Sequence, residues 1–391
     1  MPSPLAPLVW SWLARWHGWL LAALWLLVQL YSLWRHHGPH ISVDSGRFLD
    51  YAQRIADDGA FPDNHILRYV GYPLFLSFWL ALSTGLWGVV LGQIALSGVA
   101  VAALYRGVRL AAHGAWRPAA LAAGAVVLWF DIQHFNTAIL TESLFASFVM
   151  LSFWAFVQAS VRPTAGRWLV CGLVLLAAGI TRPNAFVVPA AGVVAGAVLL
   201  RQRLAERRFW VLLLVALAVL LPVGWVLLNK LLATFRLLET YQRGDVIFGY
   251  WGLLVKPVAP LVLPPDSWEP LPRLAYFILH NPVHFGKLAG LKLLVWLSSV
   301  KPYYSTLHNL ASVVVLYPSY WLAWRGLRRP GLLLPVRVFA AVVFVGQGLV
   351  VMLTVEDWDV RFLAPVLPCV FALAALEATA PDVARPSVVP S

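Results

Sequence analysis

Apolar runs alternate with short polar connections along most of this chain. A helix needs about 20 predominantly apolar residues to cross a bilayer, because the hydrocarbon thickness and the helix rise fix that length. Ten runs approach or reach this length, at 10–33, 86–105, 118–133, 143–161, 168–181, 184–200, 209–229, 305–324, 336–355 and 362–379. The pattern predicts about ten transmembrane helices, in a range of about eight to twelve. Two weaker stretches are typical of a short or re-entrant helix (72–85) and of a helix in the membrane interface (288–300).

Composition agrees with this pattern. Apolar residues make up 61% of the 391 residues and charged residues only 12%, whereas soluble domains carry roughly 25% charged residues. So few charges exclude an ordinary cytosolic enzyme, a disordered scaffold and a secreted disulfide framework. We therefore expect an all-α polytopic membrane protein, with one transmembrane domain over 1–380 and a short tail at 381–391. The net charge of +12 does not indicate nucleic-acid binding, because the arginines flank apolar segments and do not cluster in one polar domain.

The arginines also predict an orientation. Thirteen arginines and one acid, Glu206, lie in four short connections, at 106–117, 162–167, 201–208 and 325–337. The positive-inside rule places these connections in the cytoplasm. The segments that then face the outer side are 35–85, 134–142, the turn at 182, 230–304 and 356–361. Of the 17 acidic residues, 14 lie in or beside these outer segments, so we expect the polar chemistry at the outer face.

Two outer loops are long enough to hold structure of their own, 35–85 and 230–304. In the first, Phe48, Ala52 and Ile55 recur at helical spacing with charged residues on the other faces. This pattern predicts an amphipathic helix that lies in the membrane interface.

Asp44 precedes that helix and has two interpretations. A carboxylate at this position commonly accepts hydrogen bonds from the free amides of a helix N-terminus. Alternatively, a carboxylate at the bilayer boundary can act as a general base that removes a proton from an acceptor hydroxyl.

Other outer residues are candidates on similar grounds. Asp131 and Glu142 lie at the outer ends of two consecutive spans, where an acid is either solvated or, if it is buried among helices, functional. Arg68 and Tyr72 close the first outer loop and are substrate-pocket candidates, as are Asp131 and Asn184.

Cations at the outer face are the candidates for binding a phosphate. Arg182 interrupts two apolar runs, and Lys287 and Lys292 flank the start of the 288–300 stretch. Each has a simpler interpretation, a tight turn for Arg182 and snorkelling for the lysines, but a guanidinium can also bind a phosphate through two parallel hydrogen bonds. The acids of 356–361 are weak evidence for a metal site, so we expect no required metal or other cofactor, although a divalent ion is chemically compatible with the loop.

Five motifs, in this order, resemble the C-type glycosyltransferase superfamily (GT-C), and most closely the branch of the protein O-mannosyltransferases and the lipid A aminoarabinose transferase. They span most of 40–370 and are Val43-Asp44-Ser45 with Asp50-Tyr51-Ala52, Arg68-Tyr69-Val70-Gly71-Tyr72-Pro73, Leu140-Thr141-Glu142-Ser143, Thr181-Arg182-Pro183-Asn184 and Asp359-Val360-Arg361-Phe362.

The resemblance implies an inverting transferase that moves a sugar from a polyprenyl-phosphate-linked donor to a hydroxyl of a glycan, lipid or protein acceptor. By the same resemblance, Asp44 matches the catalytic base, Glu142 an acid near the donor, and Arg361 the arginine of the closing motif. We therefore expect Asp44 and Glu142 to be catalytic and Arg361 to join the cations that bind the donor phosphate. It also implies a multi-pass protein among the lipids of a bacterial inner membrane, with its active site facing the periplasm.

Three alternatives stay open at this stage. An O-antigen ligase or polymerase also acts on lipid-linked sugars and depends on a late outer loop, which 230–304 partly resembles. A transporter or flippase of lipid-linked sugars would also be polytopic, but such proteins usually carry ionisable groups near the midplane and inverted repeats, and neither is evident in this sequence. A purely structural membrane subunit is disfavoured by the two long polar loops.

Overall fold

The computed structural model of the chain describes residues 5–233 and 237–379, so the predicted tail at 381–391 lies outside the described residues. Within the described part, the secondary structure is helical apart from three isolated β-bridges. The predicted all-α class is confirmed.

Six helices are long and apolar enough to cross a membrane. They are α1 (Leu5–His36), α4 (Gly85–Ala111), α7 (Thr141–Val161), α9 (Val187–Arg203, preceded by the short helix η3, Pro183–Phe186), α10 (Glu206–Leu232) and α16 (Leu334–Leu353). A seventh span results if α5 (Trp116–Leu128) is joined to α6 (Phe130–Gln133) and η2 (His134–Thr137), which are bent from it by 68°.

Helices occupy all ten predicted span positions, but three of them do not meet the length and hydropathy of a full span. The short apolar helices are α8 (Ala165–Gly179) and α17 (Leu367–Ala378, preceded by η5, Ala364–Val366), and the third position holds α14 (Thr306–Ala311), the π-turn η4 (Ser312–Leu316) and α15 (Tyr317–Arg328). Length and composition therefore support six or seven spans directly. The weaker stretches form α3 (Gly71–Ala81) and α13 (Pro282–Ser298).

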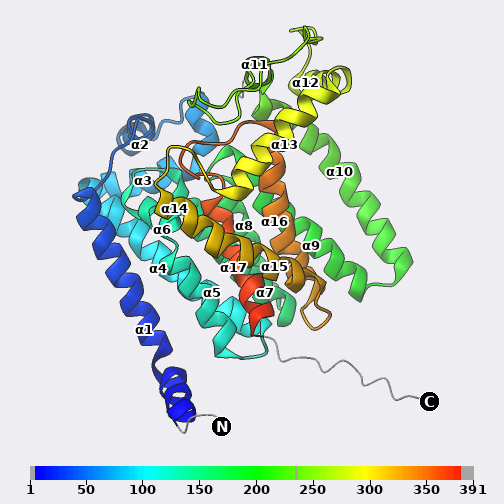
Figure 1. Cartoon of the computed structure of the whole chain (residues 1–391). Helices are drawn as coiled ribbons and strands as arrows, with labels where there is room; N and C mark the ends of the chain where they lie inside the picture. Colours follow the sequence, from blue (N-terminus) through cyan, green and yellow to red (C-terminus); the bar gives the residue numbers. More distant parts are fainter. Residues whose placement is uncertain (1–4, 234–236, 380–391) are drawn as a thin grey trace.

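The centre of the bundle is formed by α7 and α17, which pack against α4, α5, α8, α15 and α16. Phe153 and Phe156 of α7 contact Phe339 of α16 through their rings. In contrast, α10 stands apart from the other helices in Figure 1, and none of its apolar window is buried in the protein. Its apolar surface is suited to contact lipid.

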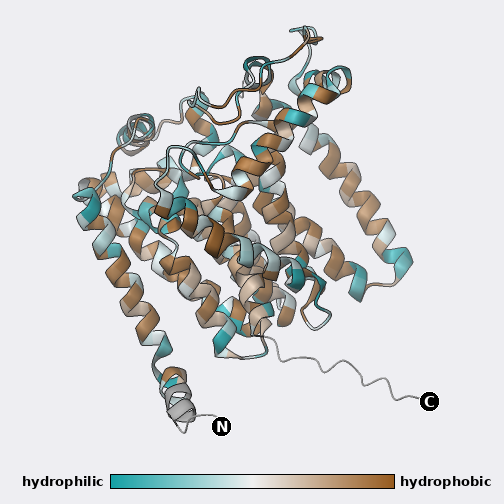
Figure 2. Ribbon diagram, viewed as in Figure 1, coloured by the Kyte–Doolittle hydropathy of each residue, from teal (hydrophilic) through white to brown (hydrophobic). Residues whose placement is uncertain are grey.

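The connections separate to two ends of the bundle, as the sequence predicts. The arginine-rich turns between α4 and α5, between α9 and α10, and between α15 and α16 lie at the lower end in Figure 1. The upper end carries α2 (Ser45–Asp58), α11 (Leu237–Arg243) and α12 (Pro270–His280), and we call it the acidic end because Asp44, Glu142 and the 356–361 loop are there. Hydrophilic residues gather at both ends and hydrophobic residues between them (Figure 2).

The first outer loop forms the amphipathic helix that its pattern predicts. Phe48, Tyr51 and Ala52 of α2 are buried, whereas Arg47 and Asp50 are exposed. Gly59 ends the helix with φ +64°, and its amide donates to the Ile55 carbonyl. Since a positive φ favours glycine, Gly59 determines the residue at which α2 ends.

A second glycine ties this loop to the core. The Gly71 amide donates to the Ile180 carbonyl at 2.9 Å, and a Cβ at Gly71 would lie only 2.9 Å from the same oxygen. The close approach requires glycine, and it holds the start of α3, after η1 (His65–Tyr69), against the segment that leads to Arg182.

Candidate active site

Four segments that are far apart in the sequence bring charged side chains to one cavity at the acidic end. Asp44 immediately precedes α2, Glu142 lies in the first turn of α7, Arg182 precedes η3, and Arg361 ends the 356–361 loop. All four line a cavity of about 160 Å³. The structure thus brings together two of the predicted phosphate-binding cations and both predicted catalytic acids.

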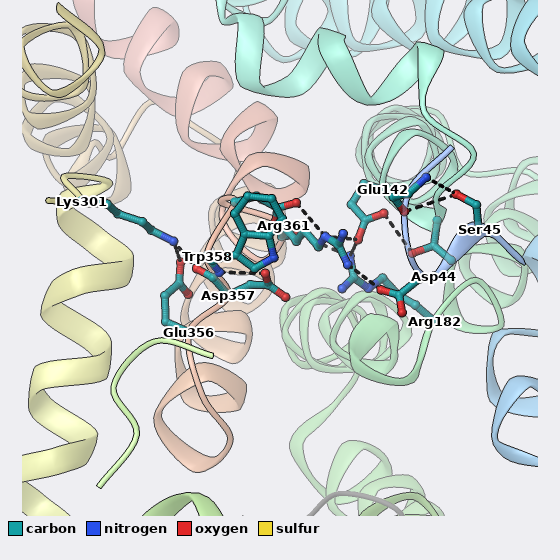
Figure 3. Close-up of polar contacts among 12 residues, drawn as sticks. Asp44, Ser45, Glu142, Arg182, Lys301, Glu356, Asp357, Trp358 and Arg361 are labelled. Atoms are coloured by element: carbon teal, nitrogen blue, oxygen red, sulfur yellow. Dashed lines mark hydrogen bonds and ion pairs between the residues drawn. The ribbon is translucent and has the colours of Figure 1, made fainter. Parts of the chain in front are cut away.

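The two arginines are bonded to the two acids. Arg361 Nη1 donates to Asp44 Oδ2 at 3.0 Å, and Arg182 Nη1 donates to Glu142 Oε1 at 3.2 Å. Arg361 Nε also lies 3.9 Å from Glu142 Oε1. Figure 3 shows Arg361 between Asp44 and the loop residues that precede it. The site is therefore a charge network in which cations and carboxylates face one small space.

Arg182 is held rigidly in this network. It is only 6% exposed, and its guanidinium carbon lies 5.7 Å and 5.3 Å from the ring centroids of Phe145 and Phe362. Its Nη1 also donates to the Arg361 carbonyl, whereas its buried Nε has no hydrogen-bond partner among the described residues. A buried guanidinium with an unpaired N–H is a suitable donor to an anion that enters the cavity.

The loop 356–361 is fixed on its far side by a buried ion pair. Lys301 Nζ lies 3.1 Å from Glu356 Oε1 and also contacts the Asp357 carbonyl, and both side chains of the pair are at most 1% exposed. Tyr303 and Tyr304 donate to the Trp358 carbonyl at 2.8 Å and 3.0 Å. The same loop is bridged to 246–248 through the Glu356 backbone.

Protonation of this loop is sensitive to its surroundings. Burial and the charge of Asp357 raise the pKa of Asp359 to about 7, although Asp359 bonds Arg361 Nε at 2.9 Å. Burial lowers the pKa of Arg361, but the carboxylates of Glu142, Asp359 and Asp357 outweigh it and raise that pKa above its usual value. Arg361 is thus a permanent cation beside an acid that titrates near neutral pH.

The helix-cap interpretation of Asp44 is wrong. Asp44 is at the N-cap position, but its side chain makes no capping hydrogen bond. Ser45 Oγ instead accepts from the Ser42 amide and donates to the Ile139 carbonyl. The Asp44 carboxylate is therefore free to face the cavity, and at 40% exposure it is accessible to a small molecule.

The substrate-pocket candidates from the sequence do not line this cavity. Tyr72 is fully buried and donates to Gln93 at 3.0 Å, and Asn184 donates to Gln347 at 2.9 Å. Asp131 lies 3.3 Å from His308. Arg68 is half-buried and precedes Tyr69, which lines the cavity, and its Nη1 has no partner among the described residues.

The two predicted lysines also lie outside the cavity. Lys287 is exposed on α13, whereas Lys292 is buried, contacts the Thr354 carbonyl and lies 3.8 Å from the Tyr241 ring centroid. The physical reason is the path of α13, which directs Lys292 toward the end of α16.

An apolar groove of about 320 Å³ lies beside the polar cavity, between α9, α10, α12 and α16. Arg182 lines the cavity, and the next two residues, Pro183 and Asn184, line the groove. At the other side, Leu353 and Thr354 line the groove shortly before Asp357 reaches the cavity. The cavity and the groove are therefore lined by neighbouring residues of the chain at two places.

Sequence reasoning missed several residues of this site. His65, Tyr69 and Phe362 line the cavity, and Lys301 fixes the loop. Tyr69 and Phe362 are inside the quoted motifs, directly beside Arg68 and Arg361, so motif adjacency is a signal that could have found them.

No group of three or more His, Cys, Asp or Glu side chains in the described ranges is arranged to hold a metal ion. The expectation that no metal is required stays a prediction.

Comparison with known proteins bears on the family. No curated protein sequence matches this chain significantly. Among solved structures, the chain is similar to ArnT from Cupriavidus metallidurans bound to undecaprenyl phosphate, with a TM-score of 0.46 and 17% identity over 92% of this chain and 60% of that one. The chain thus spans about 60% of the length of that protein.

A family similarity covers the centre of the chain, including Glu142 and Arg182 but not Asp44 or Arg361. Over residues 70–225 the chain matches the family described as dolichyl-phosphate-mannose-protein mannosyltransferase, which confirms the GT-C resemblance predicted from its motifs.

Proposed function

We propose that this protein is a membrane glycosyltransferase that takes its sugar from a polyprenyl-phosphate-linked donor and transfers it to an acceptor hydroxyl. The observation that carries the proposal is that two consecutive residues, Arg182 and Pro183, line the charged cavity and the apolar groove respectively. The groove suits a polyprenyl chain, because its lining is apolar and α10 leaves it close to lipid. The cavity suits the phosphate and the sugar.

The charges assign a role to each side of the cavity. Arg182 and Arg361 are placed to stabilise the negative charge that develops on the leaving phosphate. Buried guanidinium groups suit this task because they stay protonated and bind phosphate oxygens in pairs. The predicted Lys287 and Lys292 are not part of this proposal, since neither lines the cavity.

Asp44 is proposed as the general base. The acceptor oxygen attacks the anomeric carbon as its proton passes to an Asp44 carboxylate oxygen. The bond from that carbon to the phosphate oxygen breaks, and its electron pair leaves with the phosphate. A single displacement of this kind inverts the anomeric configuration. Glu142 stays bonded to Arg182 and orients it.

The proposed orientation places the acidic end at the periplasmic face of a bacterial inner membrane. The support is the positive-inside rule, since the arginine-rich connections lie at the opposite end.

The test is transfer of labelled sugar from synthetic undecaprenyl-phosphate sugars by the purified protein in nanodiscs, with the endogenous lipid extract as acceptor. We expect Asp44→Asn to lower the rate by about 10²–10⁴-fold, the usual contribution of a general base, and EDTA to leave the wild-type rate unchanged. Asp57→Asn, at the exposed end of α2 and outside the cavity, is the matched control. Undiminished transfer by Asp44→Asn would show that Asp44 is not the general base. Glu142 would then be the next candidate for that role.

A further inference from the structure

A second cavity adjoins the first on the side of α2. It has a volume of about 430 Å³ and is lined by Arg47, Asp50, Tyr51, Arg54, Asn64, His65 and Ile66. Arg47, His65 and Ile66 line both cavities. We call the second one the α2 cleft, and it shares these three wall residues with the cavity that Asp44 lines.

The α2 cleft carries more positive than negative charge. Arg47 and Arg54 are two helical turns apart, about 10 Å along the axis, and both line the cleft, whereas Asp50 is the one acid in its lining. Over the described ranges, the Arg54 guanidinium makes no ion pair or hydrogen bond with the rest of the chain. Burial and the positive charges of Arg68 and Arg47 lower the pKa of His65, which marks the same region as electropositive.

The direction of attack relates the cleft to the reaction. In an inverting displacement, the nucleophile approaches the anomeric carbon from the side opposite the leaving group. Asp44 lies between the two sides, 3.0 Å from Arg361 and 4.0 Å from Arg47. If the phosphate leaves toward Arg361 and Arg182, the acceptor hydroxyl arrives from the side of Arg47, where the α2 cleft lies.

We infer that the α2 cleft is the acceptor site and that it takes an acceptor with an anionic group, a phosphate or a carboxylate, which Arg47 and Arg54 bind. This inference rests on the proposed transferase function. An uncharged acceptor gains nothing from the charge of the exposed Arg54 guanidinium, whereas an anionic group gains charge-assisted hydrogen bonds from it.

The test uses three matched probes: octyl glucoside, octyl glucoside 6-phosphate and octyl glucuronide. Phenylglyoxal, which modifies accessible arginines, is applied to the full chain in nanodiscs, and labelling of each arginine is read by peptide mass spectrometry. We expect both anionic glycosides, or the one whose anion fits, to slow labelling of Arg54 several-fold, and the neutral glycoside to have no effect. Arg35, exposed at the end of α1, should be labelled equally in all cases.

A second measurement adds the sugar donor. We compare kcat/KM for the anionic glycoside that slowed labelling of Arg54 with kcat/KM for octyl glucoside. The ratio of the two should fall about tenfold in Arg54→Gln, the effect of one lost charge-assisted hydrogen bond. It should stay constant in Arg35→Gln. Labelling of Arg54 that is indifferent to all three probes, or a ratio unchanged in Arg54→Gln, overturns the inference. Protection of Arg54 without turnover of any donor by the wild type would instead refute the transferase function and, with it, the acceptor role.

Discussion

The buried Lys301–Glu356 pair offers the sharpest test of how the 356–361 loop beside the candidate site is held. In Lys301→Met, a side chain of similar length replaces the ammonium group, and Glu356 loses its counter-ion while it stays almost fully buried. Breaking a buried ion pair by removing one partner typically costs about 3–5 kcal/mol. The contact from Lys301 to the Asp357 carbonyl is lost at the same time.

The expected loss depends on pH, and its sign follows from Glu356. Burial already raises the pKa of this carboxyl above its ordinary value of 4.5, with Lys301 acting in the opposite direction, so removing Lys301 raises the pKa further. A folded state that holds an extra proton becomes less stable as pH rises above the unfolded-state pKa. In the wild type this pKa is already about 7, so the pH-dependent part of the loss is at most about 1.4 kcal/mol at pH 8, from 1.36 kcal/mol for one pH unit. At pH 5.5 it is close to zero, because the carboxyl is then protonated in both folded proteins.

The assay is reversible unfolding in mixed detergent micelles, followed by circular dichroism at both pH values. The matched control is Arg201→Met, which breaks the exposed Arg201–Glu206 pair (3.3 Å) and should cost less than about 1 kcal/mol. The double variant Lys301→Met/Glu356→Met should recover most of the loss, since no charge is left buried. A loss in Lys301→Met below about 1 kcal/mol at pH 8, or one that is equal at both pH values, would refute this reasoning.

Three further predictions concern the loop and its supports. Asp359 titrates near pH 7 beside Arg361, and protonation removes a negative charge that opposes binding of an anion. Binding of undecaprenyl methyl phosphate, a diester of constant charge, should therefore tighten by about tenfold from pH 8 to pH 6. Native mass spectrometry should show that this pH dependence disappears in Asp359→Asn. In Gly71→Ala, the new Cβ cannot fit beside the Ile180 carbonyl, so the melting temperature should fall with a loss of about 1–3 kcal/mol, and an unchanged value would contradict the close approach. Gln93→Leu leaves two carbonyls and one tyrosine hydroxyl without their buried partner and should cost about 3 kcal/mol in the same assay.

Much of the site could be predicted because the chain places its charges at the ends of apolar runs. Glu142, Arg182 and Arg361 each interrupt or flank such a run, and the bilayer confines such groups to one end of a helix bundle. Their order in the chain, together with the orientation rule, was then sufficient to predict that they share a face. The family similarity supports this interpretation for the segment that holds Glu142 and Arg182.

The lysines show what the sequence could not decide. Lys292 lies within the apolar stretch 288–300 and Lys301 directly after it, both in the same outer loop, and nothing local shows which of them meets an acid. Lys301 meets Glu356, which lies 55 residues further along the chain, whereas Lys292 contacts the carbonyl of Thr354 at the end of α16. Which lysine supports the site depends on how α13 packs, and that is a long-range property.

The sequence pattern also does not predict the buried polar network next to Glu142. Asn136 donates to Gln29 and Ser97 and accepts from Ser143 at 2.6 Å, next to Glu142. Each of these residues looks like an isolated polar position in or beside an apolar run, because hydropathy windows average it away. Only the bend between α5 and α6 brings them together.

The bonds on both flanks of the 356–361 loop bear on the order of substrate binding. Lys301, Tyr303 and Tyr304 fix the loop on one side, and Arg361 fixes it on the other. A loop held in this way is poorly suited to move aside and admit a substrate. Under the proposed function, the donor would then enter through the apolar groove beside α10 and the acceptor through the α2 cleft. Separate entrances mean that neither substrate blocks the other, so we expect random-order kinetics, in which either substrate binds first.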